Sequence, residues 1–106
     1  MTLSTHVLDT AAGKPAEGIA VRLEHQGRVL ATSRTDADGR VRSLHAEALG
    51  PGTYQLRFAV AEYFQKVGTA GFYSEILVQF EIGANGGHYH VPLLLSPFGY
   101  TTYRGS

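Results

Sequence analysis

The sequence contains no cysteine among its 106 residues. Disulfide bonds and zinc sites built from thiolates are therefore excluded. Nine Lys and Arg residues balance nine Asp and Glu residues, so the chain carries no net charge when its histidines are neutral. It lacks the excess of positive charge with which nucleic-acid-binding proteins attract phosphates. We therefore expect neither a nucleic acid nor an anionic membrane as a partner.

Long apolar segments are also missing. No run approaches the ~20 residues that span a bilayer, and the start, MTLSTHVLDTAAGKP, lacks the basic and apolar regions of a secretory signal. We expect a soluble, cytoplasmic protein. With 43% apolar and 17% charged residues, the composition is that of a globular chain. We expect residues 1–106 to form a single domain, because domains cluster near about 100–150 residues.

The sequence does contain a clear period of two. Apolar residues alternate with other residues in several short segments, which predicts β-strands. Turn-forming pairs such as Gln26-Gly27 and Asp38-Gly39 separate them. The predicted strands lie near residues 4–9, 19–26, 29–35, 40–43, 53–60, 75–83, 88–95 and 99–104. Residues 61–67 break the period and predict a short helix that stops at Gly68. The pattern favours an all-β protein, an antiparallel sandwich or barrel with one short helix.

Polar side chains suited to chemistry gather in the last segment, HYHVPLLLSPFGYTTYRGS, from His88 to Ser106. His88 and His90 are two residues apart, so both imidazoles point to the same face of a strand. Such a pair can bind a metal, but a closed site needs further ligands, and no Asp or Glu lies nearby in sequence. A pair of surface histidines and a catalytic role for one of them are the other interpretations.

Two more residues are candidates. His6 lies in the first predicted strand, and Arg40 follows the Asp38-Gly39 turn. Taken alone, each has an ordinary structural interpretation, as a hydrogen-bonded histidine and an exposed arginine beside a hairpin. Among common catalytic motifs, the nucleophile elbow, the phosphate loop, the dinucleotide fingerprint and His-Glu-x-x-His are all missing from the sequence.

Three stretches together resemble the 5-hydroxyisourate hydrolases, the transthyretin-related enzymes of purine catabolism. They are STHVLDTAAGKPAEGIAVRLE at the front, TDADGR in the middle and HYHVPLLLSPFGYTTYRGS at the back. The similarity runs from about Leu3 to Ser106. Tyr-Arg-Gly-Ser is its most discriminating part, because transthyretin, the hormone carrier of the same fold, lacks it.

The resemblance implies a transthyretin-like β-sandwich of two four-stranded sheets with one short helix. It also implies a homotetramer, a dimer of dimers with active sites at the dimer–dimer interface, and no metal or organic cofactor. The family's catalytic residues fall on His6, Arg40, His90 and Ser106, and its substrate-binding residues on His6, Arg40 and Tyr103. Thr101 stands where serine is frequent and Ser74 where proline is usual, but neither departure touches a catalytic position.

These residue types suit a hydrolysis. A neutral imidazole can take a proton from water, and a guanidinium can stabilise the oxygen anion that forms at the attacked carbonyl. His6 and His90 would then share water activation and proton delivery, while Tyr103 and Ser106 orient substrate or water. A transthyretin-like carrier without catalysis and a metal-dependent hydrolase using His88 and His90 are the alternatives.

Overall fold

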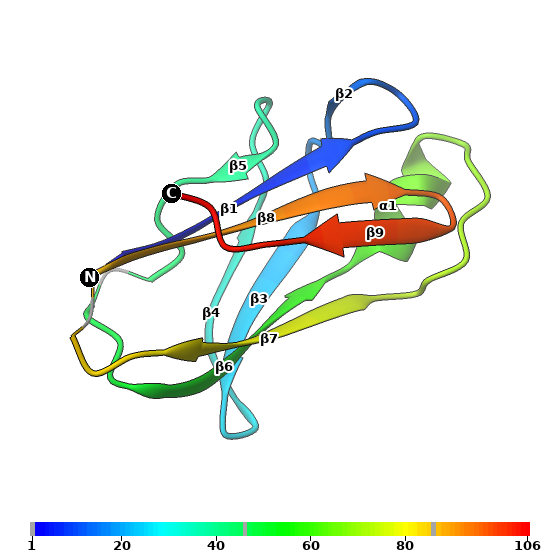
Figure 1. The fold of residues 1–106 in the computed structure, drawn as a ribbon. Coiled ribbons are helices and arrows are strands. Elements are labelled where there is room, and N and C mark those ends of the chain that lie inside the picture. The colour runs from blue at the N-terminus through cyan, green and yellow to red at the C-terminus, as the bar shows by residue number, and fades with distance from the viewer. Residues whose placement is uncertain (1, 46, 86) are drawn as a thin grey trace.

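The computed structural model describes residues 2–45, 47–85 and 87–106, and Met1, Ala46 and Gly86 lie outside the described residues. Strands and a short helix make up its regular structure (Figure 1). In chain order the elements are β1 (Thr2–Asp9), β2 (Lys14–Pro15), β3 (Ala20–His25), β4 (Arg28–Arg34), β5 (Arg40–Val41), β6 (Gly52–Phe58), α1 (Val60–Lys66), β7 (Ile76–Ile82), β8 (His88–Ser96) and β9 (Gly99–Thr102).

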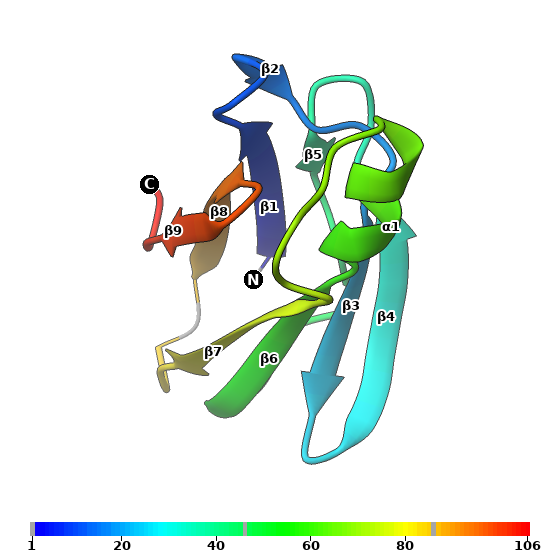
Figure 2. The same cartoon turned by 90° about the vertical axis from the view of Figure 1, so that its right-hand side faces the viewer.

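The strands form two sheets that face each other as layers (Figure 2). One sheet has the order β2-β1-β8-β9, with β5 pairing to β1, and the other has the order β4-β3-β6-β7. β1 and β8 are parallel, and the other pairs are antiparallel. The prediction of antiparallel strands is therefore wrong for this pair, because alternation within a strand does not show the direction of the strand beside it. The all-β sandwich with one short helix is therefore confirmed for the described part of the chain.

One sheet differs from the expected four strands. It has five, because β2, a pair of residues, adds to the edge of β1 through the partners Leu8↔Pro15 and Asp9↔Lys14. A segment of two residues has no period to detect, and Lys14-Pro15 has the composition of a turn. The predicted strand at 40–43 is also shorter, because β5 ends at Val41.

The core lies between the layers and follows the period of two. In β8 the residues Tyr89, Val91, Leu93 and Leu95 are buried, and they face the buried side chains of the other sheet, which include Leu56 and Phe58. Each fully buried large apolar side chain contributes about 1.5–3 kcal/mol. Because successive strand residues point to opposite faces, this burial turns the even-numbered residues of β8 outward. The outer face of this sheet thus carries His88 and His90.

The helix begins one residue earlier than predicted. Val60, Tyr63 and Phe64 are its buried residues, at the i, i+3 and i+4 spacing of one helix face. Lys66 lies in the last turn, where its charge favours the negative end of the helix. Gly68 follows with φ +73°, a left-handed conformation that glycine adopts without strain. The predicted stop at Gly68 is therefore confirmed. No helix in the described ranges is long and apolar enough to cross a membrane.

A buried carboxylate ties α1 to β1. The Tyr63 hydroxyl donates a hydrogen bond to Oδ2 of Asp9 at 2.7 Å, and the backbone N–H of Ala12 donates to Oδ1 at 2.9 Å. Asp9 is only 5% exposed. Burial, with the Asp9 hydrogen bond and charge in second place, raises the pKa of Tyr63 well above its usual range. The phenol therefore stays a donor at all physiological pH values.

Replacing Tyr63 with phenylalanine is expected to lower the free energy of unfolding by about 1–3 kcal/mol, because it leaves a buried carboxylate oxygen without its donor. Chemical denaturation of both proteins measures the difference. Tyr100→Phe is the matched control, since Tyr100 is 42% exposed and the same hydroxyl is removed at the surface. Equal losses in the two variants would contradict the role given to Asp9.

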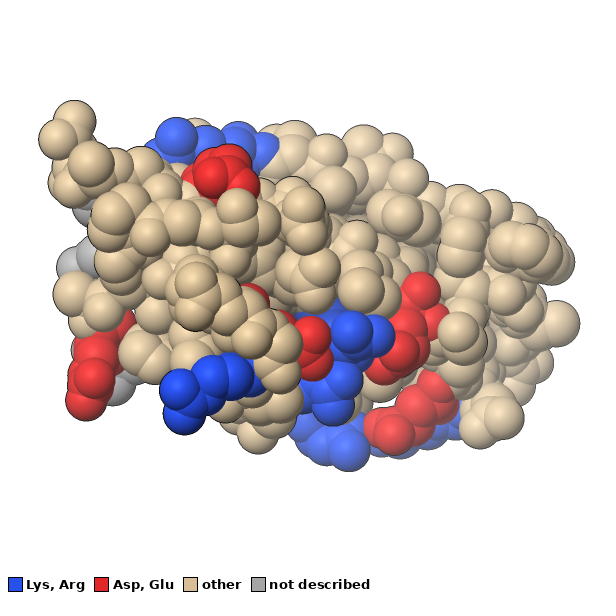
Figure 3. All heavy atoms as spheres, turned by 90° about the horizontal axis from the view of Figure 1, so that it is seen from below, with Lys and Arg blue, Asp and Glu red and all other residues tan. Residues whose placement is uncertain are grey.

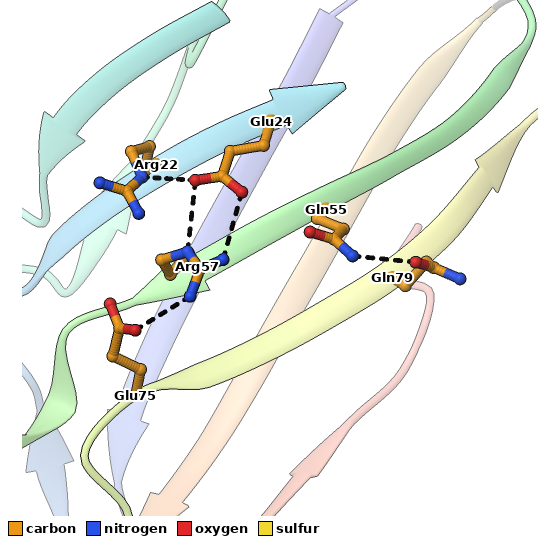
Figure 4. A network of polar contacts seen from close by, with 6 residues as sticks. All are labelled: Arg22, Glu24, Gln55, Arg57, Glu75 and Gln79. Carbon is orange, nitrogen blue, oxygen red and sulfur yellow. Dashed lines mark hydrogen bonds and ion pairs between the residues drawn. The ribbon is translucent and has the colours of Figure 1, made fainter. Parts of the chain in front are cut away.

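The outer face of the second sheet carries a group of paired polar side chains (Figure 4). The Glu24 carboxylate accepts hydrogen bonds from Arg22 at 2.6 Å and from Arg57 at 3.2 and 3.3 Å. Arg57 also donates to Glu75 at 2.9 Å, and Gln55 donates to Gln79. The Arg57 and Arg22 bonds hold the pKa of Glu24 below its usual value. In the face shown in Figure 3, acidic and basic side chains lie among one another.

Candidate functional site

The polar candidates lie on the outer face of the first sheet, where three strands meet. His6 on β1 has two register partners, Arg40 on β5 and Pro92 on β8. Ser4, one step along the same face of β1, is paired with His90. Register partners lie side by side on the same face of a sheet. The pairing of β1 with β8 therefore brings His6 and His90 from opposite ends of the chain onto one surface next to Arg40.

A small polar hollow of about 190 Å³ opens on this surface. It is lined by Ser4, Thr5, Arg40, Val41, Arg42, His88, His90 and Ser106. Ligand sites for drug-sized molecules measure about 300–1,000 Å³, so this hollow suits a smaller, polar molecule. Its lining comes from β1, β5 and the residue after it, β8 and the segment after β9, and it combines imidazole, guanidinium and hydroxyl groups.

Ser4 is a member of this site that the sequence analysis did not identify. Its Oγ lies 2.7 Å from Nδ1 of His90 and 3.4 Å from Nε2 of His88. The short contact orients the His90 ring and engages Nδ1, so that Nε2 is the nitrogen left for proton transfer. The period of two could have indicated Ser4 as a neighbour of the site, because Ser4 and His6 are two residues apart and share a strand face.

Both predicted catalytic histidines are shifted toward the neutral form. Burial lowers the pKa of His90 below 6.5, and the positive charges of Arg40, His6 and His88 act in the same direction. Burial and the Arg40 charge lower the pKa of His6, against a smaller opposing effect of the Asp38 backbone. A neutral imidazole is the form that accepts a proton. The site therefore keeps two proton acceptors available at neutral pH.

The Arg40 guanidinium is expected to hold down the pKa of His90 in solution. Replacing it with glutamine removes a positive charge while the burial remains, so the pKa of His90 should rise toward 6.5. NMR titration of the imidazole protons measures this value. Arg42→Gln is the matched control, because Arg42 lies 3.4 Å from Asp38 and 4.0 Å from Asp36, whose charges offset its own. A wild-type value above 6.5, or the same shift in both variants, would contradict this explanation.

The turn before β5 positions Arg40. Oδ1 of Asp36 accepts hydrogen bonds from the backbone N–H groups of Asp38 at 2.9 Å and Arg40 at 3.0 Å. These bonds, the one from Arg40 first, hold the pKa of Asp36 below its usual value. Gly39 has φ +74°, and a Cβ there would lie 2.4 Å from the carbonyl oxygen of Val7. Only glycine fits, and so the TDADGR stretch is a turn that presents Arg40 beside His6.

The predicted site residues are not all gathered in one place. Arg40, His90 and Ser106 line the hollow, and His6 lies beside Arg40 on the same sheet face although it is not among the lining residues. Tyr103 lines another hollow, of about 230 Å³, together with Arg104 and residues of β7 and β8. Tyr103 is 55% exposed.

The interpretation of His88 and His90 as metal ligands receives little support from the described residues. Within residues 2–45, 47–85 and 87–106, no group of three or more His, Asp or Glu side chains lies close enough to hold a metal ion. The rings of His88 and His90 are 6.4 Å apart and nearly parallel.

The fold and the hollow together define a class of protein: a transthyretin-like β-sandwich with a small polar site on one outer sheet face. The sequence model of one family, HIUase/Transthyretin, matches residues 3–105. The chain belongs to the HIUase/Transthyretin family.

Relatives of known name support this assignment. A protein of Caulobacter vibrioides named 5-hydroxyisourate hydrolase is 45% identical, over 98% of this chain and 97% of its own. The solved structure of Klebsiella pneumoniae 5-hydroxyisourate hydrolase is 40% identical with a TM-score of 0.94, and all of both chains is covered. Sea bream transthyretin, solved in complex with thyroxine, is 32% identical with a TM-score of 0.90, over 99% of this chain and 95% of its own.

Proposed function

We propose that this protein is an enzyme that hydrolyses 5-hydroxyisourate. The reaction opens the six-membered ring at an amide bond and forms 2-oxo-4-hydroxy-4-carboxy-5-ureidoimidazoline. Relatives named for this activity match the chain over nearly its whole length. The observation that carries the proposal is the meeting of Arg40, His90 and Ser106 around one small polar hollow, with His6 beside Arg40. Those residues come from three separate parts of the sequence.

The chemistry follows from the groups present. A neutral imidazole takes a proton from water as the water oxygen forms a bond to the ring carbonyl carbon. The negative charge that develops on the carbonyl oxygen is stabilised by the Arg40 guanidinium. The carbon–nitrogen bond then breaks, and the imidazolium returns its proton to the leaving nitrogen. His6 and His90 share these two transfers, and the Ser4 hydroxyl keeps the His90 ring in place.

Substrate orientation is assigned to three groups. Arg40 can form a two-pronged contact with a planar, oxygen-rich molecule. Ser106 lies in the lining of the hollow and can donate or accept a hydrogen bond there. Tyr103 lines the neighbouring hollow instead. Its contribution to substrate binding therefore requires that the substrate or an adjacent subunit extend the site toward it.

The assembly proposed for this enzyme is a homotetramer, a dimer of dimers with the active sites at the dimer–dimer interface. In support, large apolar side chains are exposed on the edge strands and in the turn between β8 and β9: Leu77 on β7, Phe98 in that turn and Tyr100 on β9 are 42%, 71% and 42% exposed. Because the net charge of the chain is zero, no excess of one charge keeps its copies apart. Light scattering should give four times the mass of one chain.

A direct absorbance assay on freshly generated 5-hydroxyisourate tests the function. The wild-type protein should accelerate the loss of substrate, His90→Asn should do so far more slowly, and a chelator should change neither rate. A carrier is the second candidate, favoured by the likeness to a transthyretin that binds thyroxine. A wild-type protein that binds the substrate without accelerating its loss would support the carrier and contradict the hydrolase. Activity that disappears with a chelator would instead support a metal-dependent enzyme.

A further inference from the structure

We propose that Arg104 and Gly105 are positioning residues, which hold Ser106 and the His90 ring in their places at the hollow. This inference rests on the proposed hydrolase activity and extends it to two residues that do not line the hollow themselves. Neither residue reaches a reacting atom in this role. Their effect passes through the neighbouring Ser106 and through the imidazole of His90.

The segment after β9 continues the sheet. Thr102 is paired with Leu93, and three residues later Gly105 is paired with His90, so the register is unchanged. The N–H of Gly105 donates a hydrogen bond to the carbonyl oxygen of His90 at 2.7 Å. Between the two pairs lies Pro92, which has no N–H to offer the ladder. The segment is therefore held in register beyond the proline by a contact to His90 itself.

Gly105 packs directly against the His90 ring. A Cβ at position 105 would lie 2.5 Å from Cδ2 of His90 and 3.2 Å from Cγ of Pro92. The φ of Gly105 lies outside the left-handed range, so an alanine there meets a lack of space rather than backbone strain. Nδ1 of the ring already shares a hydrogen bond of 2.7 Å with Oγ of Ser4. The imidazole is thus held between the Ser4 hydroxyl and the Gly105 backbone, and a side chain at 105 must displace it.

Arg104 anchors the same segment from the other side of the sheet. Its guanidinium carbon lies 4.3 Å from the centre of the Tyr89 ring, within the range of about 6 Å in which a cation is attracted to an aromatic face. Tyr89 is 7% exposed, and its hydroxyl accepts a hydrogen bond from the N–H of Gly83 at 2.9 Å. A fixed ring therefore holds Arg104, the residue directly before Gly105. Arg104 lines the hollow beside β7, away from the one with Arg40.

Three variants test the proposal: Gly105→Ala, Arg104→Ala and Arg104→Lys. Gly50→Ala is the matched control, because a Cβ at Gly50 meets nothing within 4 Å. Gly105→Ala should lower kcat by about tenfold to a hundredfold with a smaller change in KM, since misplacing a reacting group by about 1 Å can cost about a hundredfold in rate. It should also shift the NMR titration of the His90 ring, and Gly50→Ala should change neither. Arg104→Ala should weaken the protection of the Gly105 amide against hydrogen exchange and lower kcat, and Arg104→Lys should restore part of both.

The amide exchange and the ring titration need no substrate, so they decide the positioning role even if wild-type protein fails to turn over 5-hydroxyisourate. In that case the proposed function fails separately. Unchanged amide protection in Arg104→Ala would overturn the role of Arg104. An unchanged His90 titration together with a normal kcat in Gly105→Ala would overturn the role of Gly105. A lysine at 104 that behaves like alanine would show that the contact to Tyr89 does not hold the segment.

Discussion

Replacing Arg40 with alanine is expected to remove most of the hydrolytic activity while the fold remains intact. Loss of one group that stabilises a developing oxyanion typically lowers kcat by about 10²–10³-fold. Burial lowers the pKa of both His6 and His90, and the Arg40 charge lowers it further. The variant therefore loses the group that stabilises the anion and also part of the effect that keeps the two imidazoles neutral. The rate of 5-hydroxyisourate loss measures the effect.

The fold should survive because the backbone of Arg40 supplies the structural contacts of that turn. Its N–H donates to Asp36, and its carbonyl accepts from the Asp36 N–H at 2.9 Å, and alanine keeps both. Arg28→Ala is the matched control, an exposed arginine on β4 of the other sheet. Circular dichroism melting compares the three proteins. Near-wild-type turnover in Arg40→Ala would refute the assigned role, and unfolding of the variant would show that the side chain has a structural task instead.

Deleting residues 103–106 is expected to abolish hydrolysis with little loss of thermal stability. The deletion removes Ser106 from the lining of the hollow and takes away the backbone that packs against the His90 ring. To the fold these residues contribute the contact of the exposed Arg104 with the Tyr89 ring and the hydrogen bond from Gly105 to His90. We expect Tm to fall by no more than about 8 °C, the shift that corresponds to about 1 kcal/mol in a domain of this size.

Ser106→Ala separates the hydroxyl from the backbone. It should retain more activity than the deletion, because Gly105 and its contact to His90 remain. Equal losses in the two variants would assign the whole effect to the hydroxyl of Ser106. A truncated protein with full activity would mean that residues 103–106 lie outside the active site. Ser106 would then line the hollow without taking part in catalysis.

Much of the fold could be predicted from local pattern. Alternation located β3, β6, β7 and β8 and put His88 and His90 on one strand face, and the break in alternation located α1. The spacing of turn residues indicated β1, β4, β5 and β9. β2 was missed, since its two residues form a strand only through pairing with Leu8 and Asp9. Where so short a segment is a strand only because a neighbouring strand pairs with it, its own residues carry no signal.

The site could be predicted only in part. Resemblance to the family pointed to His6, Arg40, His90, Ser106 and Tyr103, and the described chain brings the first four near one hollow while Tyr103 lines another. The roles of all five remain predictions. Ser4 was missed although alternation puts it on the same strand face as His6, because a serine at such a position is not by itself evidence of a site. Only its distance of 2.7 Å from the His90 ring reveals it.

By itself, the sequence determined which residues face inward and where the chain turns. Both properties depend on neighbours within a few positions: side chains alternate along a strand, and Asp36 and Gly39 build their turn locally. Only the tertiary structure decided that β1 lies parallel to β8 with His6 and Ser4 beside Pro92 and His90. Backbone hydrogen bonds are the same for any pair of strands, so the choice of partner and register comes from burying two apolar faces together. The burial of apolar side chains on the inner face of β1 and β8 therefore fixes which polar side chains meet on their outer face.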